Sequence, residues 1–144
     1  MRSFSARGKW LLLLAMVTLI DAGFPSGVRA DEIDISAFPT VRVNSSVGST
    51  ARRQLTPAEA SKAPLLISKN KDGYVWASRD GRHLVHVESG IFHYFIEPGG
   101  AGFVKVSSVP IPTEAGDAKF AYLESLSLGL ETITYWGLAG SFAP

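Results

Sequence analysis

The chain has 144 residues, no cysteine and a formal net charge of +1, and this length suits a single globular domain. The absence of cysteine excludes disulfide cross-links, thiol catalysis and thiolate metal sites. Residues 31–144 hold ten basic and twelve acidic side chains, a near-neutral balance without the basic footprint of a nucleic-acid-binding protein. We therefore expect no nucleic acid among its partners.

Residues 1–30 have the three parts of a cleavable signal peptide. A basic start precedes the uncharged apolar run Trp10 to Ile20, and Val28-Arg29-Ala30 places small or apolar side chains where signal peptidase reads the chain. At about 1.5 Å per residue, the apolar run covers about half of a hydrocarbon core roughly 30 Å thick. We therefore predict a periplasmic or secreted protein with no stable membrane span after cleavage. An uncleaved N-terminal anchor is the alternative.

The segment 31–55 is predicted to be an extended or poorly ordered arm ahead of one globular domain, 56–144. Its polar stretch Ser45 to Ser49 and the run Arg52-Arg53-Gln54 have no apolar rhythm. Strand-like alternation occurs at two places, either of which would add an edge strand: Ile33 with Ile35, and Val41 with Val43.

Thr56-Pro57-Ala58-Glu59 has the signature of a helix start. Threonine caps the first turn, proline suits the first helical position, and glutamate three residues after the threonine closes a capping box. Because the residue before a proline disfavours helical geometry, the helix should end before Pro64. The pattern predicts a short helix over 57–62.

The region 73–107 predicts an antiparallel meander. Runs of β-branched and aromatic residues alternate with the turn signals Asp80-Gly81 and Ser89-Gly90 and with the glycine-rich connection 98–102. Residues near the C-terminus are equally rich in strand formers. The predicted strands are 73–79, 82–88, 91–97, 103–107 and 132–137.

The register of this meander follows from its loop lengths. Two-residue loops at both turn signals place Trp76 opposite Val85 and His86 opposite His93, and a slip of one residue would exchange the faces. With a five-residue loop over 98–102, one face becomes almost wholly apolar. It collects Tyr74, Trp76, Val85, Val87, Phe92, Tyr94, Ile96, Val104 and Val106.

A helix over 117–128 is predicted to cover that apolar face. Phe120, Leu123 and Leu126 recur at helical spacing, and Gly129 is well placed to end the helix. A sheet of about four to five strands with a helix on one face gives an α+β fold class.

His86, Glu88 and His93 form the sharpest candidate site. The predicted register puts the two histidines directly opposite each other, where Cβ atoms lie about 4.5–5.5 Å apart, with Glu88 diagonal to His93. Two imidazoles and a carboxylate are ligands that zinc or copper accepts. The alternative is an ordinary set of exposed strand residues, since no fourth ligand is evident.

The face that carries the histidines is also unusually apolar for a surface that meets only water. We expect either that another element, such as the arm 31–55 or the last strand, covers it or that it contacts an unknown protein or small ligand. The residues of this candidate ligand or partner surface are Leu84, His86, Ile91, His93, Phe95 and Phe103.

No catalytic motif stands out. No serine lies in a Gly-x-Ser-x-Gly elbow, and the connection 98–102 lacks the Lys-Ser/Thr ending of a phosphate loop. Enzyme activity is therefore disfavoured, and three functions remain in order. The first is an exported, non-enzymatic binding or accessory protein, the second an exported transition-metal-binding protein, and the third a small hydrolase with an unrecognised site.

Overall fold

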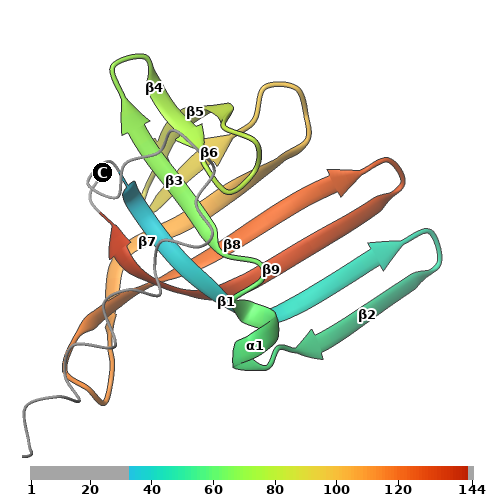
Figure 1. Cartoon of the computed structure of the whole chain (residues 1–144), viewed down its shortest axis with the longest axis horizontal. Helices are drawn as coiled ribbons and strands as arrows, with labels where there is room; N and C mark the ends of the chain where they lie inside the picture. The colour runs from blue at the N-terminus through green and yellow to red at the C-terminus, as the bar shows by residue number, and fades with distance from the viewer. Residues whose placement is uncertain (1–32, 143–144) are drawn as a thin grey trace, which may run out of the picture.

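The structure, a computed structural model, describes residues 33–142, which form a closed antiparallel β-barrel (Figure 1). The predicted signal peptide lies outside these residues. Within them, no helix has the length and apolar character needed to cross a membrane. The elements are β1 (Ile33–Ser46), β2 (Ser49–Gln54), α1 (Pro57–Ala60), β3 (Leu65–Asn70), β4 (Gly73–Trp76), β5 (Arg82–Ser89), β6 (Phe92–Ile96), β7 (Gly102–Pro112), β8 (Ala118–Leu128) and β9 (Glu131–Phe142).

The barrel closes through β1, the longest strand. Its first part pairs with β3, as in Ile35 with Ile67, and its second part pairs with β2, as in Val43 with Arg52. Along its other edge β1 pairs with β9, which completes a ring of eight strands and leaves β2 outside it. The β1–β2 and β8–β9 hairpins continue beyond the ring as an open extension (Figure 1). All six side chains of β2 are exposed.

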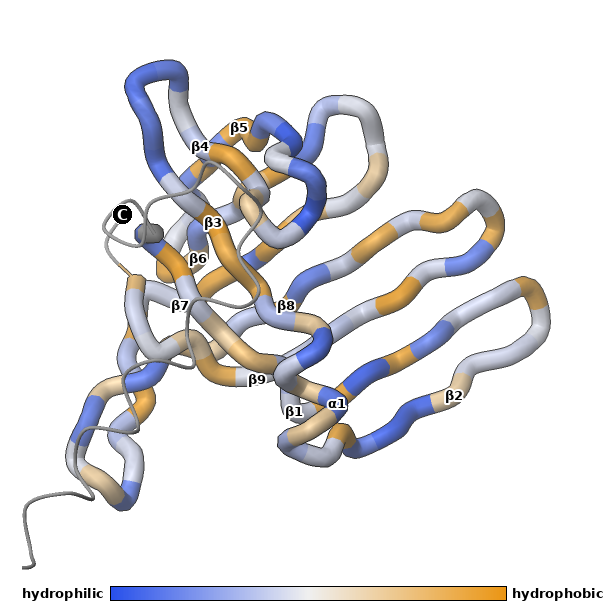
Figure 2. The backbone as a smooth tube through the Cα atoms, viewed as in Figure 1, coloured by the Kyte–Doolittle hydropathy of each residue, from blue (hydrophilic) through white to orange (hydrophobic). Residues whose placement is uncertain are grey.

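Alternate side chains fill the barrel interior. Ile35, Ile67, Trp76, Phe95 and Val104 are fully buried, and the register places them beside one another on neighbouring strands. Figure 2 shows hydrophobic and hydrophilic residues interchanging along β8 and β9, as expected for strands with one inner and one outer face. An eight-stranded barrel is just wide enough for its interior to be packed with side chains.

The predicted α+β class is wrong, because segment 117–128 is a strand. β8 turns Phe120, Tyr122, Glu124 and Leu126 toward the interior, with Tyr122 and Glu124 buried. The apparent helical spacing combined residues from both faces of this strand. A charged residue at a buried position also interrupted the apolar alternation by which a strand is recognised.

The predicted strands of the meander exist, but the register between β4 and β5 differs. Trp76 pairs with Arg82 rather than with Val85. Ser78 is held by β3 instead, since its hydroxyl accepts a hydrogen bond from the Leu66 amide at 3.0 Å and its amide donates to the Leu66 carbonyl at 3.3 Å. The turn therefore spans 77–81, with Asp80 and Gly81 both at positive φ.

Relative to the predicted pairing, β5 is shifted by three residues. A shift by an odd number moves every side chain of β5 to the opposite face of the sheet. Leu84 points into the barrel and is buried, whereas Val85 and Val87 point outward and are 51% and 44% exposed. A second odd shift, which pairs Ile96 with Phe103, brings β7 back into step, so that Val104 and Val106 face inward. The predicted apolar face therefore combined inward-facing residues of β4 and β7 with outward-facing residues of β5 and β6.

The N-terminal region gives two further outcomes. Residues 33–54 of the predicted arm form β1 and β2, and β1 is a full member of the barrel. The capping box at α1 is confirmed: the Thr56 hydroxyl accepts from the Glu59 amide at 3.3 Å, and the Thr56 amide donates to the Glu59 carboxylate at 2.9 Å.

Candidate functional site

His86, Glu88 and His93 meet at one end of the barrel. The register between β5 and β6 is shifted by an even number from the predicted one, so Glu88 lies directly opposite His93 and His86 lies opposite Phe95. An even shift keeps every side chain on its face. One donor atom from each of the three residues lies within 4.8 Å of the others. The three predicted ligands are therefore neighbours, although the pairing between them is not the one expected.

The two imidazoles are in direct contact. His86 Nε2 lies 2.9 Å from His93 Nδ1, and the rings are stacked with centroids 5.2 Å apart. Glu88 Oε1 lies 3.8 Å from His93 Nδ1. His93 is buried, whereas the Glu88 side chain is 67% exposed, so the cluster opens to solvent on the carboxylate side.

Aromatic rings hold the histidines in place. His86 stacks on Phe95 with centroids 4.8 Å apart and meets the edge of Tyr74 at 5.1 Å. His93 meets Phe142 edge-on at 4.8 Å. Burial, reinforced by the neighbouring His93, lowers the pKa of His86, which favours the neutral imidazole that ligates metals. We call these five residues, with Glu88, the histidine end.

The six residues of the predicted partner surface do not form one surface. Leu84, His93 and Phe95 are buried in the barrel lining, and His86 is half-buried beside them. Ile91 lies in the β5–β6 turn and is half exposed. Phe103 is half-buried on the outer side of β7, where it pairs with Ile96.

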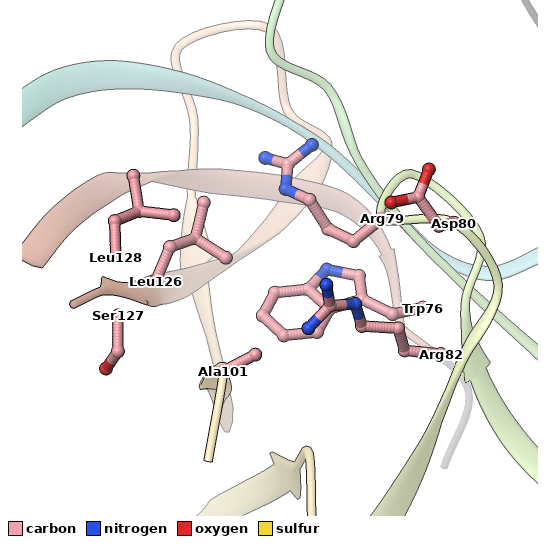
Figure 3. Close-up of a pocket in the computed structure, with 8 residues that line it drawn as sticks. All are labelled: Trp76, Arg79, Asp80, Arg82, Ala101, Leu126, Ser127 and Leu128. Atoms are coloured by element: carbon pink, nitrogen blue, oxygen red, sulfur yellow. The ribbon is translucent and has the colours of Figure 1, made fainter. Parts of the chain in front are cut away.

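A cavity at the opposite end of β5 was not predicted. It has a volume of about 140 Å³ and lies between the 77–81 turn, the 98–102 connection and β8 (Figure 3). We call this region the arginine end. It is lined by Trp76, Arg79, Asp80, Arg82, Ala101, Leu126, Ser127 and Leu128.

A buried ion pair lies beside this cavity. Arg79 Nη2 is 2.9 Å from Glu124 Oε2, and Glu124 is completely buried. Burial raises the pKa of Glu124 to about 7 even though the Arg79 charge opposes the shift. Burial also raises the pKa of Tyr122, with the Glu124 charge contributing. A neutral and an ionised Glu124 are therefore both accessible near neutral pH.

Several polar atoms at the arginine end have no partner among the described residues. They are Trp76 Nε1, Arg79 Nε, Tyr122 Oη and Glu124 Oε1, all buried. The indole N–H of Trp76 is near enough to favour the ionised form of Glu124, but it makes no hydrogen bond of acceptable geometry. Buried polar atoms are nearly always hydrogen-bonded, so this group stands out from the rest of the barrel.

The fold and its two ends define a small antiparallel β-barrel whose interior is packed with side chains and whose ends carry polar clusters. The chain matches no family model, no curated protein and no solved structure. Its function must therefore be inferred from the residues at the two ends.

Proposed function

We propose that this protein is an exported, non-enzymatic binding protein that takes up a transition-metal ion, zinc or copper, through His86, Glu88 and His93. The convergence of three donor atoms from two strands within 4.8 Å carries this proposal. Imidazole nitrogens with a carboxylate oxygen are a common ligand set for these ions.

The spacing of the donor atoms suits a tetrahedral ion. Ligands about 2.0–2.1 Å from zinc lie about 3.3–3.4 Å from each other. The observed separations of 2.9 Å between the histidine nitrogens and 3.8 Å between His93 and Glu88 lie on either side of that value. Side-chain rotations that bring Glu88 toward His86, whose donor atoms lie within 4.8 Å of each other, would place all three atoms on one ion, with a fourth position left for water.

A hydrogen bond between the two imidazoles explains the 2.9 Å contact without a metal. In that state one ring nitrogen donates its proton to the other, and a metal would replace the proton. The buried position of His93 and the stacking of His86 on Phe95 hold both rings ready for either partner. The two alternatives are separated by measuring binding.

The site supports binding better than catalysis. Tyr74, Phe95 and Phe142 pack against the two histidines, and the exposed Glu88 is the solvent-facing ligand. An ion can enter from the Glu88 side, while a large substrate would have to displace packed aromatic rings. Export of the protein remains part of this proposal, since it rests on residues 1–30.

Isothermal titration with zinc and with copper tests the proposal. We expect one ion per chain, and a loss of at least a hundredfold in affinity in the His86→Ala/His93→Ala double variant. His83→Ala is the matched control, because His83 lies on the same strand but is exposed. The absence of saturable binding at tens of micromolar metal, or equal binding by the double variant, would overturn the proposal.

A further inference from the structure

The cavity at the arginine end has the size and walls of a site for one flat ring. Figure 3 shows the Trp76 indole on one side of it, Leu126 and Leu128 on the other, and Ala101 below. Its volume is about 140 Å³, and a protein cavity of about 150 Å³ with apolar walls is known to hold benzene. A single six-membered ring therefore fits this volume, against the leucines.

Two guanidinium groups line the same cavity. Arg79 is already paired with Glu124, but Arg82 is exposed and forms no ion pair within the described part of the chain. Hydrogen bonds from the Ala101 and Gly99 amides lower the pKa of the half-buried Glu97, and the Arg82 charge adds to this without a direct contact. The carboxylate of Asp80 is turned away from the indole (Figure 3). Arg82 therefore has a guanidinium free for an external anion.

The unpartnered atoms near the cavity are mainly donors. Trp76 Nε1 and Arg79 Nε can only donate hydrogen bonds, and both are buried without an acceptor among residues 33–142. Glu124 Oε1 is the one unpartnered pure acceptor beside them, and the Tyr122 hydroxyl can do either. These buried atoms are an unpaired mixture of donors and acceptors beside the cavity, and the exposed Arg82 is the group that an external anion can reach.

We propose that the arginine end binds a small aromatic carboxylate, with its ring against Leu126 and Leu128 and its carboxylate on Arg82. Guanidinium and carboxylate groups match in a planar, two-bond geometry, and Leu126, Leu128 and Ala101 give an aromatic ring apolar walls. A phosphate ion would leave the apolar walls empty, and a neutral aromatic molecule would leave the Arg82 guanidinium without a counter-charge. An aromatic carboxylate satisfies both parts of the cavity.

The site is independent of the proposed metal site. Arg82 begins β5, and Glu88 lies near its other end, so either site can be disrupted without a change in the other. Loss of metal binding in the double histidine variant should leave carboxylate binding intact. Failure of one proposal is thereby distinguishable from failure of the other.

Titration of the nitrogen-15-labelled protein with benzoate, followed by the indole N–H resonance of Trp76, tests the proposal. The resonance is assigned by its loss in a Trp76→Phe variant, and the exposed Trp136 serves as an internal reference. We expect saturable shifts at Trp76 with benzoate. Benzamide, which has the ring without the charge, and acetate, which has the charge without the ring, should each bind at least tenfold more weakly.

Arginine variants complete the experiment. Arg82→Gln should weaken benzoate binding at least tenfold and Arg82→Lys by less, whereas Arg52→Gln on the exposed strand β2 should have no effect. A dispersed spectrum with unshifted His86 and His93 signals shows that each variant is folded. The proposal is overturned by the absence of saturation at tens of millimolar benzoate, by equal binding of benzamide, or by full binding to Arg82→Gln.

Discussion

The two ends of the barrel bury polar side chains in opposite ways. At the histidine end the buried polar atoms satisfy one another, because His86 and His93 are in direct contact and Glu88 remains in solvent. At the arginine end Glu124 is completely buried, and one of its oxygens has no partner. An unsatisfied buried polar group costs about 1–3 kcal/mol. A metal at the histidine end must therefore replace a contact already made, whereas a carboxylate ligand on Arg82 adds a contact without removing the cost of the unpartnered Glu124 oxygen.

Replacement of Trp76 by alanine should produce the largest loss of stability. Trp76 is fully buried between β3 and β5 and forms a wall of the cavity. Truncation of a buried tryptophan to alanine costs about 3–5 kcal/mol, which urea denaturation would measure. The exposed Trp136→Ala change is the control and should cost far less. A loss below about 1 kcal/mol at Trp76 would show that the arginine end is not part of the packed interior.

The Glu124→Gln variant should differ from the native protein in how its stability depends on pH, which tests the buried carboxylate at the arginine end. Because the pKa of Glu124 is raised from 4.5 to about 7 on folding, the folded state loses stability as the pH rises from 4.5 through 7. The full loss above pH 7 corresponds to about 3 kcal/mol. The glutamine variant should lack this fall, so its advantage over the native chain should grow between pH 5 and pH 8.

The matched control for that measurement is Glu97→Gln. Hydrogen bonds from the Ala101 and Gly99 amides lower the pKa of the half-buried Glu97, so this carboxylate adds stability above its unfolded pKa, and the stability is lost as the pH falls. The two variants should therefore change the pH profile in opposite directions. If the stability of the native protein and of Glu124→Gln changed with pH in the same way, the raised pKa of Glu124 would be contradicted.

Zinc should raise the stability of the histidine end measurably. A ligand that binds only the folded state at a free concentration of a hundred times its dissociation constant adds about 2.7 kcal/mol. We expect thermal denaturation to show this gain in the native protein and in Glu124→Gln, but not in His86→Ala/His93→Ala. A chelator should reverse it. An equal gain in the double histidine variant would place the ion elsewhere.

Local patterns in the sequence are sufficient to find the strands but not to join them. β5, β6 and β9 lie where alternation and turn residues predict them. The register between β4 and β5 depends on hydrogen bonds between Ser78 and Leu66, twelve residues earlier, and no local pattern reveals a competition of that kind. The predicted helix over 117–128 was wrong for a related reason. The inward position of Glu124 is explained by its ion pair with the distant Arg79, which no local pattern reveals.

The same distinction explains which end could be predicted. His86, Glu88 and His93 lie on adjacent strands joined by a short turn, and the error in their register was even, so they stayed on one face. Arg79 and Glu124 are separated by forty-five positions and meet only when β8 is placed across the barrel. No spacing in the sequence links these two residues. The arginine end could therefore not be predicted without the arrangement of the strands in the barrel.

Thr56→Ala should have the smallest effect and should separate general destabilisation from changes at either end. The Thr56 side chain caps α1 by accepting from the Glu59 amide, and loss of such a cap costs about 1 kcal/mol. Denaturation should show this loss, while zinc and benzoate affinities measured well below the midpoint remain unchanged. If either affinity falls with the cap, that end depends on the stability of the whole barrel. The effects of histidine and arginine variants would then have to be corrected for stability before they are assigned to direct contacts.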